Sequence, residues 1–81
     1  MELNLHMFQT LDAVSLNELV EIAQIANDNI APKLSEMGLT KGQKIKAIFK
    51  APFGDPIAFE INGSVISMRK EEAKQVEVQM A

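Results

Sequence analysis

The sequence predicts a mostly β fold with short helices, in which five short strands form a small barrel. Three observations predict this class. Residues 43–50 alternate between apolar and polar side chains, as a strand with one wet face does. Residues 57–68 contain Asn62-Gly63, a favoured two-residue turn of β-hairpins. Strands this short must be covered or closed, which favours a barrel over an open sheet.

Length and composition limit what the chain can be. Its 81 residues suffice for one domain, and we expect residues 1–9 to form a lead and residues 10–81 to form the domain. The chain contains no cysteine, which excludes disulfides and thiolate metal sites. The formal net charge of −3 argues against nucleic acid as the main partner, because such binding depends on neutralising phosphates. There is neither an apolar run long enough to span a bilayer nor a signal-peptide layout, so we expect a cytoplasmic protein.

The first half of the domain holds one ambiguous segment and one predicted helix. Residues 16–26 fit either a helical stripe or a strand, and neither periodicity nor propensity decides between them. A polar cluster followed by apolar residues at helical spacing predicts a helix over residues 29–37. Gly38 can adopt the left-handed conformation that ends a helix, with Leu39 packing back on the last turn. Lys41-Gly42 then turns the chain into the next strand.

The strand predicted at residues 43–50 points two kinds of side chain in opposite directions. Ile45, Ala47 and Phe49 are expected to face the core. The opposite, wet face carries Ile48 together with Lys44, Lys46 and Lys50. A rigid loop follows at residues 51–56, because each of its two prolines restricts the backbone of the residue before it.

The hairpin at residues 57–68 has a register that its turn determines. With Asn62-Gly63 at the tip, apolar residues of the two strands meet on one face, whereas a shift by one residue would scatter them. Residues 69–74 are predicted to form one helical turn, and residues 76–80 to form the last strand. The expected hairpin pairs are Ile61 with Ser64, Glu60 with Val65, Phe59 with Ile66, and Ile57 with Met68.

Several of these segments resemble the FeoA family, the ferrous-iron transport protein A family. The resemblance covers residues 10–80, and its most specific part is the run Ala-Pro-Phe-Gly-Asp-Pro-Ile at residues 51–57. Residues 36–39, Gly42 and residues 68–73 also carry it. In two places, at Asn17-Glu18 and Lys41-Gly42, the chain departs from the family's usual Pro-Gly. The resemblance implies an SH3-like barrel, and it places residues 19–25 on the family's first strand, which resolves the ambiguous segment in favour of a strand.

The resemblance also implies a function without catalysis. FeoA proteins are thought to support FeoB, a membrane ferrous-iron transporter whose cytosolic part is a G domain. A member of the family would be a cytoplasmic accessory protein that binds this G domain, reaches the inner face of the membrane through it, and modulates the assembly or activity of the transporter. Two alternatives stay open, a transition-metal-binding regulatory module, like the same domain at the end of iron- and manganese-dependent repressors, and a small metal carrier. The oligomeric state is open between a monomer and a weak oligomer.

Two groups of apolar and acidic residues are candidates for contact with a partner. Phe53 and Asp55 lie in the proline-bracketed loop, where they either form a recognition surface or stiffen a connector. Leu34, Met37 and Leu39 either line an apolar groove beside the barrel or pack the helix onto it.

A third candidate is a basic stripe on the wet strand face. It either steers the protein toward an acidic partner or anionic lipid, or is a solvated outer face that lysine protects from edge pairing. Its members are Lys41, Lys44, Lys46 and Lys50.

No catalytic residue and no intrinsic cofactor is expected. The chain lacks a cysteine nucleophile, a serine–histidine–acid arrangement and a glycine-rich phosphate loop. His6 is the only histidine, whereas transition-metal sites normally use several nitrogen or sulfur ligands. Weak binding of Fe(II) or another transition metal therefore enters only through the family resemblance. We interpret Glu71-Glu72 as the exposed face of a helical turn.

Overall fold

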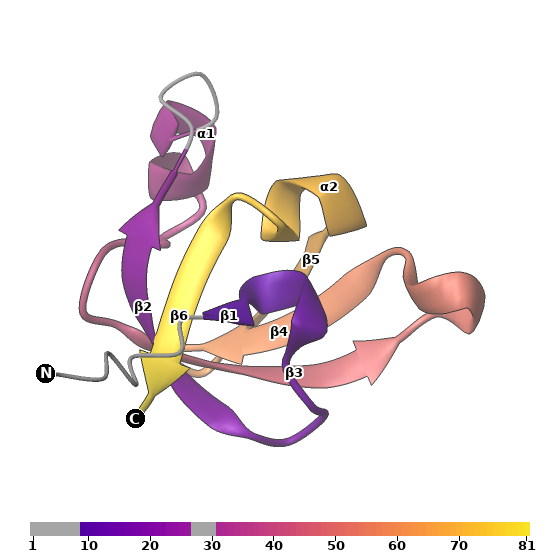
Figure 1. The fold of residues 1–81 in the computed structure, drawn as a ribbon. Helices are drawn as coiled ribbons and strands as arrows, with labels where there is room; N and C mark the ends of the chain where they lie inside the picture. The colour runs from indigo at the N-terminus through magenta and orange to yellow at the C-terminus, as the bar shows by residue number, and fades with distance from the viewer. Residues whose placement is uncertain (1–8, 27–30) are drawn as a thin grey trace, which may run out of the picture.

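The computed structural model describes residues 9–26 and 31–81, whose strands form one antiparallel sheet (Figure 1). Within these residues the sheet has six strands in the order β1-β6-β2-β3-β4-β5. The strands are β1 (Gln9–Thr10), β2 (Leu19–Ile25), β3 (Lys44–Lys50), β4 (Ile57–Ile61), β5 (Ser64–Met68) and β6 (Val76–Met80). The helices are the 3-10 helices η1 (Leu11–Ala13) and η2 (Pro52–Gly54) and the short α-helices α1 (Ala31–Glu36) and α2 (Lys70–Ala73).

The predicted class, mostly β with short helices, is confirmed, and β2 shows that the ambiguous segment is a strand. Two details differ from the prediction. A sixth strand, β1, pairs Gln9 with Val78 and Thr10 with Glu77, so the sheet begins one residue before the predicted domain boundary. The sheet also stays open, because β1 and β5 are its two ends and do not pair with each other in the described part of the chain.

One hydrophobic core joins the sheet to the helices. Three helices each contribute a fully buried residue: α1 contributes Leu34, α2 contributes Ala73 and η1 contributes Leu11. No polar or charged residue is buried in the described ranges, so close packing of apolar side chains holds the core together. Its other members are Val14, Val20, Ile22, Leu39, Ile45, Ala47, Ile57, Phe59, Ile61, Met68, Val76 and Val78.

Helix α1 ends as the sequence predicts. Gly38 has φ +94°, a conformation that side chains disfavour, and its N–H donates to the carbonyl of Ser35 at 2.9 Å. The N–H of Leu39 donates to the carbonyl of Leu34 at 2.9 Å, and both leucine side chains are buried. This pair of bonds is the Schellman motif with its apolar contact. Of the predicted helix, residues 29 and 30 lie outside the described residues, and the α-helical part ends at Glu36.

The predicted hairpin is confirmed pair by pair. β4 and β5 place Ile61 opposite Ser64, Phe59 opposite Ile66, and Ile57 opposite Met68, with Glu60 opposite Val65 between them. The turn residues Asn62 and Gly63 both have positive φ, at 53° and 79°. That combination is what a two-residue turn with the twist of the flanking strands requires.

A bulge in β3 overturns the prediction for the end of that strand. Ala47 lies opposite Phe59 and Phe49 lies opposite Ala58, so Ile48 is an extra residue in the ladder. Beyond the bulge the two faces are exchanged. Phe49 is 58 % exposed instead of buried, whereas the predicted solvent-facing residue Lys50 is half-buried. The predicted orientations of Phe49 and Lys50 are therefore wrong.

The last helix, α2, and the last strand, β6, form where the sequence predicts them, but in each of them the exposure of one side chain differs from the prediction. In β6, Val76 and Val78 are buried as an alternating strand requires, but Met80 at the strand end is 81 % exposed. In α2, Glu71 is exposed while the Glu72 side chain retains only 12 % of its accessible surface. The prediction that both glutamates form an exposed face is wrong for Glu72.

Candidate functional site

The β3–β4 loop, residues 51–56, presents an aromatic ring to solvent. Phe53 is fully exposed, at 101 % of its reference surface. Its φ is +70°, a left-handed conformation that is strained for a bulky side chain. The segment around it, η2, follows Ala51 with Pro52 in its first turn. An apolar side chain held outward by an unfavourable backbone conformation indicates a contact surface more than a packing role.

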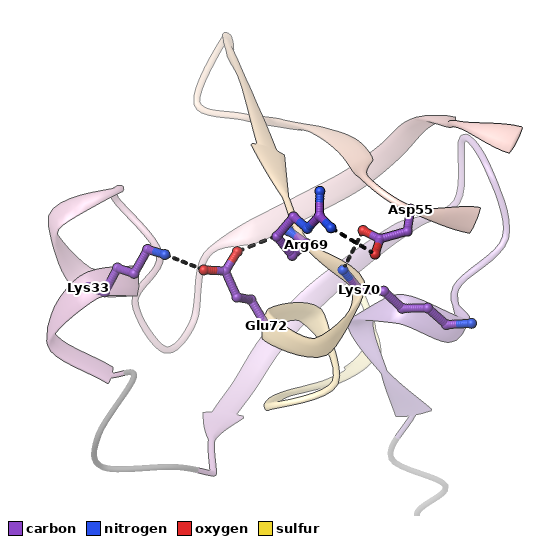
Figure 2. Close-up of polar contacts among 5 residues, drawn as sticks. All are labelled: Lys33, Asp55, Arg69, Lys70 and Glu72. Atoms are coloured by element: carbon purple, nitrogen blue, oxygen red, sulfur yellow. Dashed lines mark hydrogen bonds and ion pairs between the residues drawn. The ribbon is translucent and has the colours of Figure 1, made fainter. Parts of the chain in front are cut away.

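Hydrogen bonds fix the shape of this loop. The N–H of Ala51 donates to the carbonyl of Pro56 at 3.0 Å, and the N–H of Gly54 donates to the carbonyl of Ala51 at 2.7 Å. The Asp55 carboxylate then joins the loop to α2, because its Oδ1 accepts from the backbone N–H of Lys70 at 2.9 Å (Figure 2). Phe53 therefore projects from a closed and tethered loop.

Arg69 and Glu72 extend this tether to the other helix. An Arg69 guanidinium nitrogen lies 3.7 Å from Oδ2 of Asp55, while the backbone N–H of Arg69 donates to Oε1 of Glu72 at 2.9 Å. The other Glu72 oxygen is paired with the ammonium group of Lys33 in α1 (Figure 2). The hydrogen bond from Lys33, and next the one from the Arg69 N–H, hold the pKa of Glu72 below its usual value of 4.5. A continuous series of polar contacts thus connects α1, α2 and the β3–β4 loop.

The outer face of the sheet carries a basic hollow over β2, β3 and β4. Lys46 lies opposite Leu19 of β2 and Glu60 of β4, and its Nζ is 3.5 Å from a Glu60 oxygen. The open hollow has a volume of about 460 Å³. Its lining consists of Leu19, Gly42, Lys44, Lys46, Glu60, Asn62 and Gly63.

The structure divides the predicted basic stripe. Lys41 and Lys44 are exposed and Lys46 is half-exposed. Lys50 points elsewhere, because its Nζ donates to the carbonyl of Val14 at 2.8 Å. Of the predicted stripe, Lys41, Lys44 and Lys46 therefore remain accessible on the outer face, whereas Lys50 donates a hydrogen bond within the fold.

The predicted apolar group does not lie together at the surface. Leu34 and Leu39 are fully buried in the core, and Met37 is partly buried against it. They pack α1 onto the sheet, so these two leucines are not available to a partner in this conformation. Sequence reasoning instead missed the exposed Phe49, and only the bulge accounts for that exposure. The bulge could not be predicted from the alternation of apolar and polar residues, because the extra residue, Ile48, is itself apolar and typical of a strand.

The described residues contain no group of three or more metal-ligating side chains that could hold an ion. His6, the only histidine of the chain, lies outside them. None of the helices in the described ranges has the length and apolar character that crossing a membrane requires.

Comparison with known proteins identifies the family. The model of the FeoA domain matches residues 9–80. The chain belongs to the FeoA family. The chain is similar to a FeoA-like protein from Clostridium acetobutylicum, with 34 % identity, a TM-score of 0.84, and coverage of 90 % of this chain and 86 % of that one. It is also similar to the FeoA protein of Chlorobium tepidum, with 30 % identity, a TM-score of 0.79, and coverage of 89 % and 70 %. No curated protein matched the chain.

These likenesses confirm the SH3-like FeoA fold that the sequence implied. The same fold occurs in a manganese-dependent transcriptional repressor, with a TM-score of 0.85 at 12 % identity, over 99 % of this FeoA chain and 45 % of the repressor. At that identity the likeness concerns the fold alone.

Proposed function

We propose that this FeoA protein is a non-enzymatic accessory protein of ferrous iron uptake, which binds the cytosolic G domain of a FeoB-type membrane transporter. Family membership supports the iron-uptake part. Solved relatives include an iron(II) transport protein A from Clostridium thermocellum and a protein described as an iron uptake regulatory protein (FeoA). The protein then acts on the cytoplasmic side and reaches the membrane through its partner.

The observation that carries the docking part is the outward position of Phe53. Aromatic residues supply a large share of binding energy at the centres of interfaces, because they bury much apolar area and have few rotamers to lose. The backbone on both sides of Phe53 is already held by the hydrogen bonds of the tethered loop, so binding orders little additional backbone. A loop backbone that is ordered before binding and that carries a fully exposed ring is what a docking loop needs.

The charge pattern favours an acidic partner surface. The chain has a net charge of −3, yet Lys41, Lys44 and Lys46 gather at one end of β3 and in the turn before it. Such a local basic patch speeds encounter with an acidic surface and loses this effect as salt screens it. An association rate that falls as salt is raised from 50 to about 300 mM supports this steering.

The test is the affinity of the transporter's purified G domain for the Phe53→Ala variant, measured by titration calorimetry with and without guanine nucleotide. Loss of an anchoring aromatic side chain is expected to weaken binding by at least about tenfold. Met80→Ala is the matched control, since Met80 is also large, apolar and exposed but lies on β6.

Equal affinities for the wild type and Phe53→Ala, with the variant still folded, would remove the loop from the interface. No binding of the wild-type chain in either nucleotide state would refute the proposed partner.

A further inference from the structure

The unpaired edge of β5 is the part of the sheet that is built to accept another strand. The pair Ile61 and Ser64 closes the two-residue turn, so it is a hydrogen-bonded pair of the β4–β5 ladder. Pairs alternate along an antiparallel ladder, which places the N–H and C=O groups of Val65 and Ser67 on the free side. Across residues 9–26 and 31–81, no hydrogen bond from these two backbones to another element is present.

This edge lacks the features that normally prevent edge pairing. Proteins protect edge strands with lysine, proline, bulges or a covering segment. β5 reads Ser-Val-Ile-Ser-Met, without charge or proline, and its ladder to β4 is regular from end to end. Val65 is 64 % exposed, and Ser64 and Ser67 are exposed as well. β3 by contrast, which is paired on both sides, carries three lysines.

The arrangement of the edge fits a second copy of this chain. We propose that β5 pairs with β5 of a second copy, antiparallel, around a two-fold axis that passes beside Ile66. In that register Val65 and Ser67 of each copy exchange hydrogen bonds, giving about four bonds between the chains. The same strand serves both sides of a two-fold interface, as an isologous dimer requires.

The side chains support the same register. Ile66 would lie opposite its own copy in a non-hydrogen-bonded pair, where side chains are closest. Ile66 is partly buried against the core, so pairing would cover the part of it that remains accessible. Each copy has a net charge of −3, but β5 contains no charged residue, so pairing two β5 strands brings no like charges of this strand together. The two sheets would thereby continue as one.

The lack of cysteine in the chain makes a register-specific test simple. In the proposed dimer the two Cα atoms at position 66 lie about 4.5 Å apart, within the range that a disulfide spans. The whole chain carrying Ile66→Cys should therefore form a covalent dimer under mild oxidation. Lys44→Cys, on the exposed face of β3, is the control and should remain monomeric.

A second measurement addresses the unmodified edge. Sedimentation equilibrium of the wild type at 10 μM to about 1 mM should show a monomer–dimer equilibrium. Ser67→Pro removes an N–H that faces the free side, a position at which edge strands tolerate proline. It should raise the dimer dissociation constant by about tenfold, because each dimer loses about two of its hydrogen bonds. Val65→Lys keeps every backbone donor and adds a charge to the edge. It should also weaken the dimer, and this result would not depend on how proline affects the backbone of β5.

The outcomes decide the proposal. Concentration-dependent dimers weakened by both substitutions, with covalent capture at position 66, support it. A wild type that stays monomeric across the whole range overturns it. Dimers indifferent to both substitutions, or covalent capture equally efficient at position 44, place the contact elsewhere and overturn it as well. None of these measurements involves the transporter, so they are independent of the proposed function.

Discussion

Lys50 offers the sharpest test of how the N-terminal part of the domain is held. Its ammonium group donates to the carbonyl of Val14 at 2.8 Å, and a second carbonyl, that of Asp12, lies at 3.5 Å. Val14 itself is fully buried, so replacing Lys50 leaves a carbonyl in a poorly hydrated place without its donor. We propose Lys50→Met, which keeps an unbranched chain of similar length and removes the charge and the donors.

The expected loss follows from the two distances. The contact at 3.5 Å is too long to count, which leaves one charged hydrogen bond of normal length. Such a bond contributes about 1.5–3 kcal/mol, and partial exposure of Lys50 favours the lower part, about 2 kcal/mol. A domain of this size has a total stability of roughly 4–12 kcal/mol. The loss is therefore a large fraction of the total, and it should lower the melting temperature by about 10 °C.

Urea unfolding followed by far-ultraviolet circular dichroism is the suitable assay, because the chain has neither tryptophan nor tyrosine. Lys44→Met is the matched control. Lys44 lies on the same strand, is exposed, and makes no side-chain hydrogen bond or ion pair with the residues described. Its replacement should change stability by no more than about 0.5 kcal/mol. If the two variants were equally stable, Lys50 would have no structural role.

Two further substitutions test the end of α1 and the ion-paired carboxylate of Glu72. Gly38→Ala forces a side chain into φ +94° and should lower the free energy of unfolding, measured by thermal unfolding, by about 1–2 kcal/mol. The control is Ser35→Ala on the exposed side of α1, which should lower it by less than about 0.5 kcal/mol. Equal losses of stability in the two variants would show that the backbone at Gly38 is not strained by a side chain. Glu72→Gln should destabilise the protein at neutral pH, because the lowered pKa means that ionised Glu72 stabilises the fold above its ordinary value of 4.5. That contribution is lost as pH falls below 4.5, so the stabilities of the wild type and Glu72→Gln should converge in acid. A stability difference that stays constant with pH would exclude the ion pair between Glu72 and Lys33.

The parts of the fold that the sequence predicts correctly are those governed by local backbone chemistry. Asn62-Gly63 requires left-handed angles that other residues avoid, so the turn and hence the whole β4–β5 register could be read from two residues. Gly38 likewise marks the end of α1, and its Schellman bonds are those expected. In both places the need for a positive φ identifies the turn or the helix end from one or two residues.

The errors come from tertiary effects that no local pattern encodes. The bulge at Ile48 exchanges the faces of β3, so Phe49 and Lys50 each lie on the face opposite to the predicted one. β1 is too short to carry alternation, and it exists because β6 offers it a partner. The sequence predicts a solvent-exposed Glu72, because its ion-pair partner Lys33 is distant along the chain.

The candidate site was predicted only in part. Sequence reasoning selected the loop of Phe53 and Asp55, since two prolines bracket it, but could not decide whether the aromatic ring was inside or outside. The outward position depends on the positive φ of Phe53 and on the bond from Lys70 to Asp55, which joins residues fifteen apart. For Leu34 and Leu39 the sequence favoured packing of the helix onto the barrel over an apolar groove, and both side chains are fully buried.

The pairing of Gln9 with Val78 brings the beginning and the end of the folded unit to neighbouring strands at the side of the sheet opposite β5. A short peptide could therefore join the two ends, and new termini could be opened at the Asn62-Gly63 tip without cutting through the core. This FeoA domain can therefore be circularly permuted with every strand of its described sheet kept.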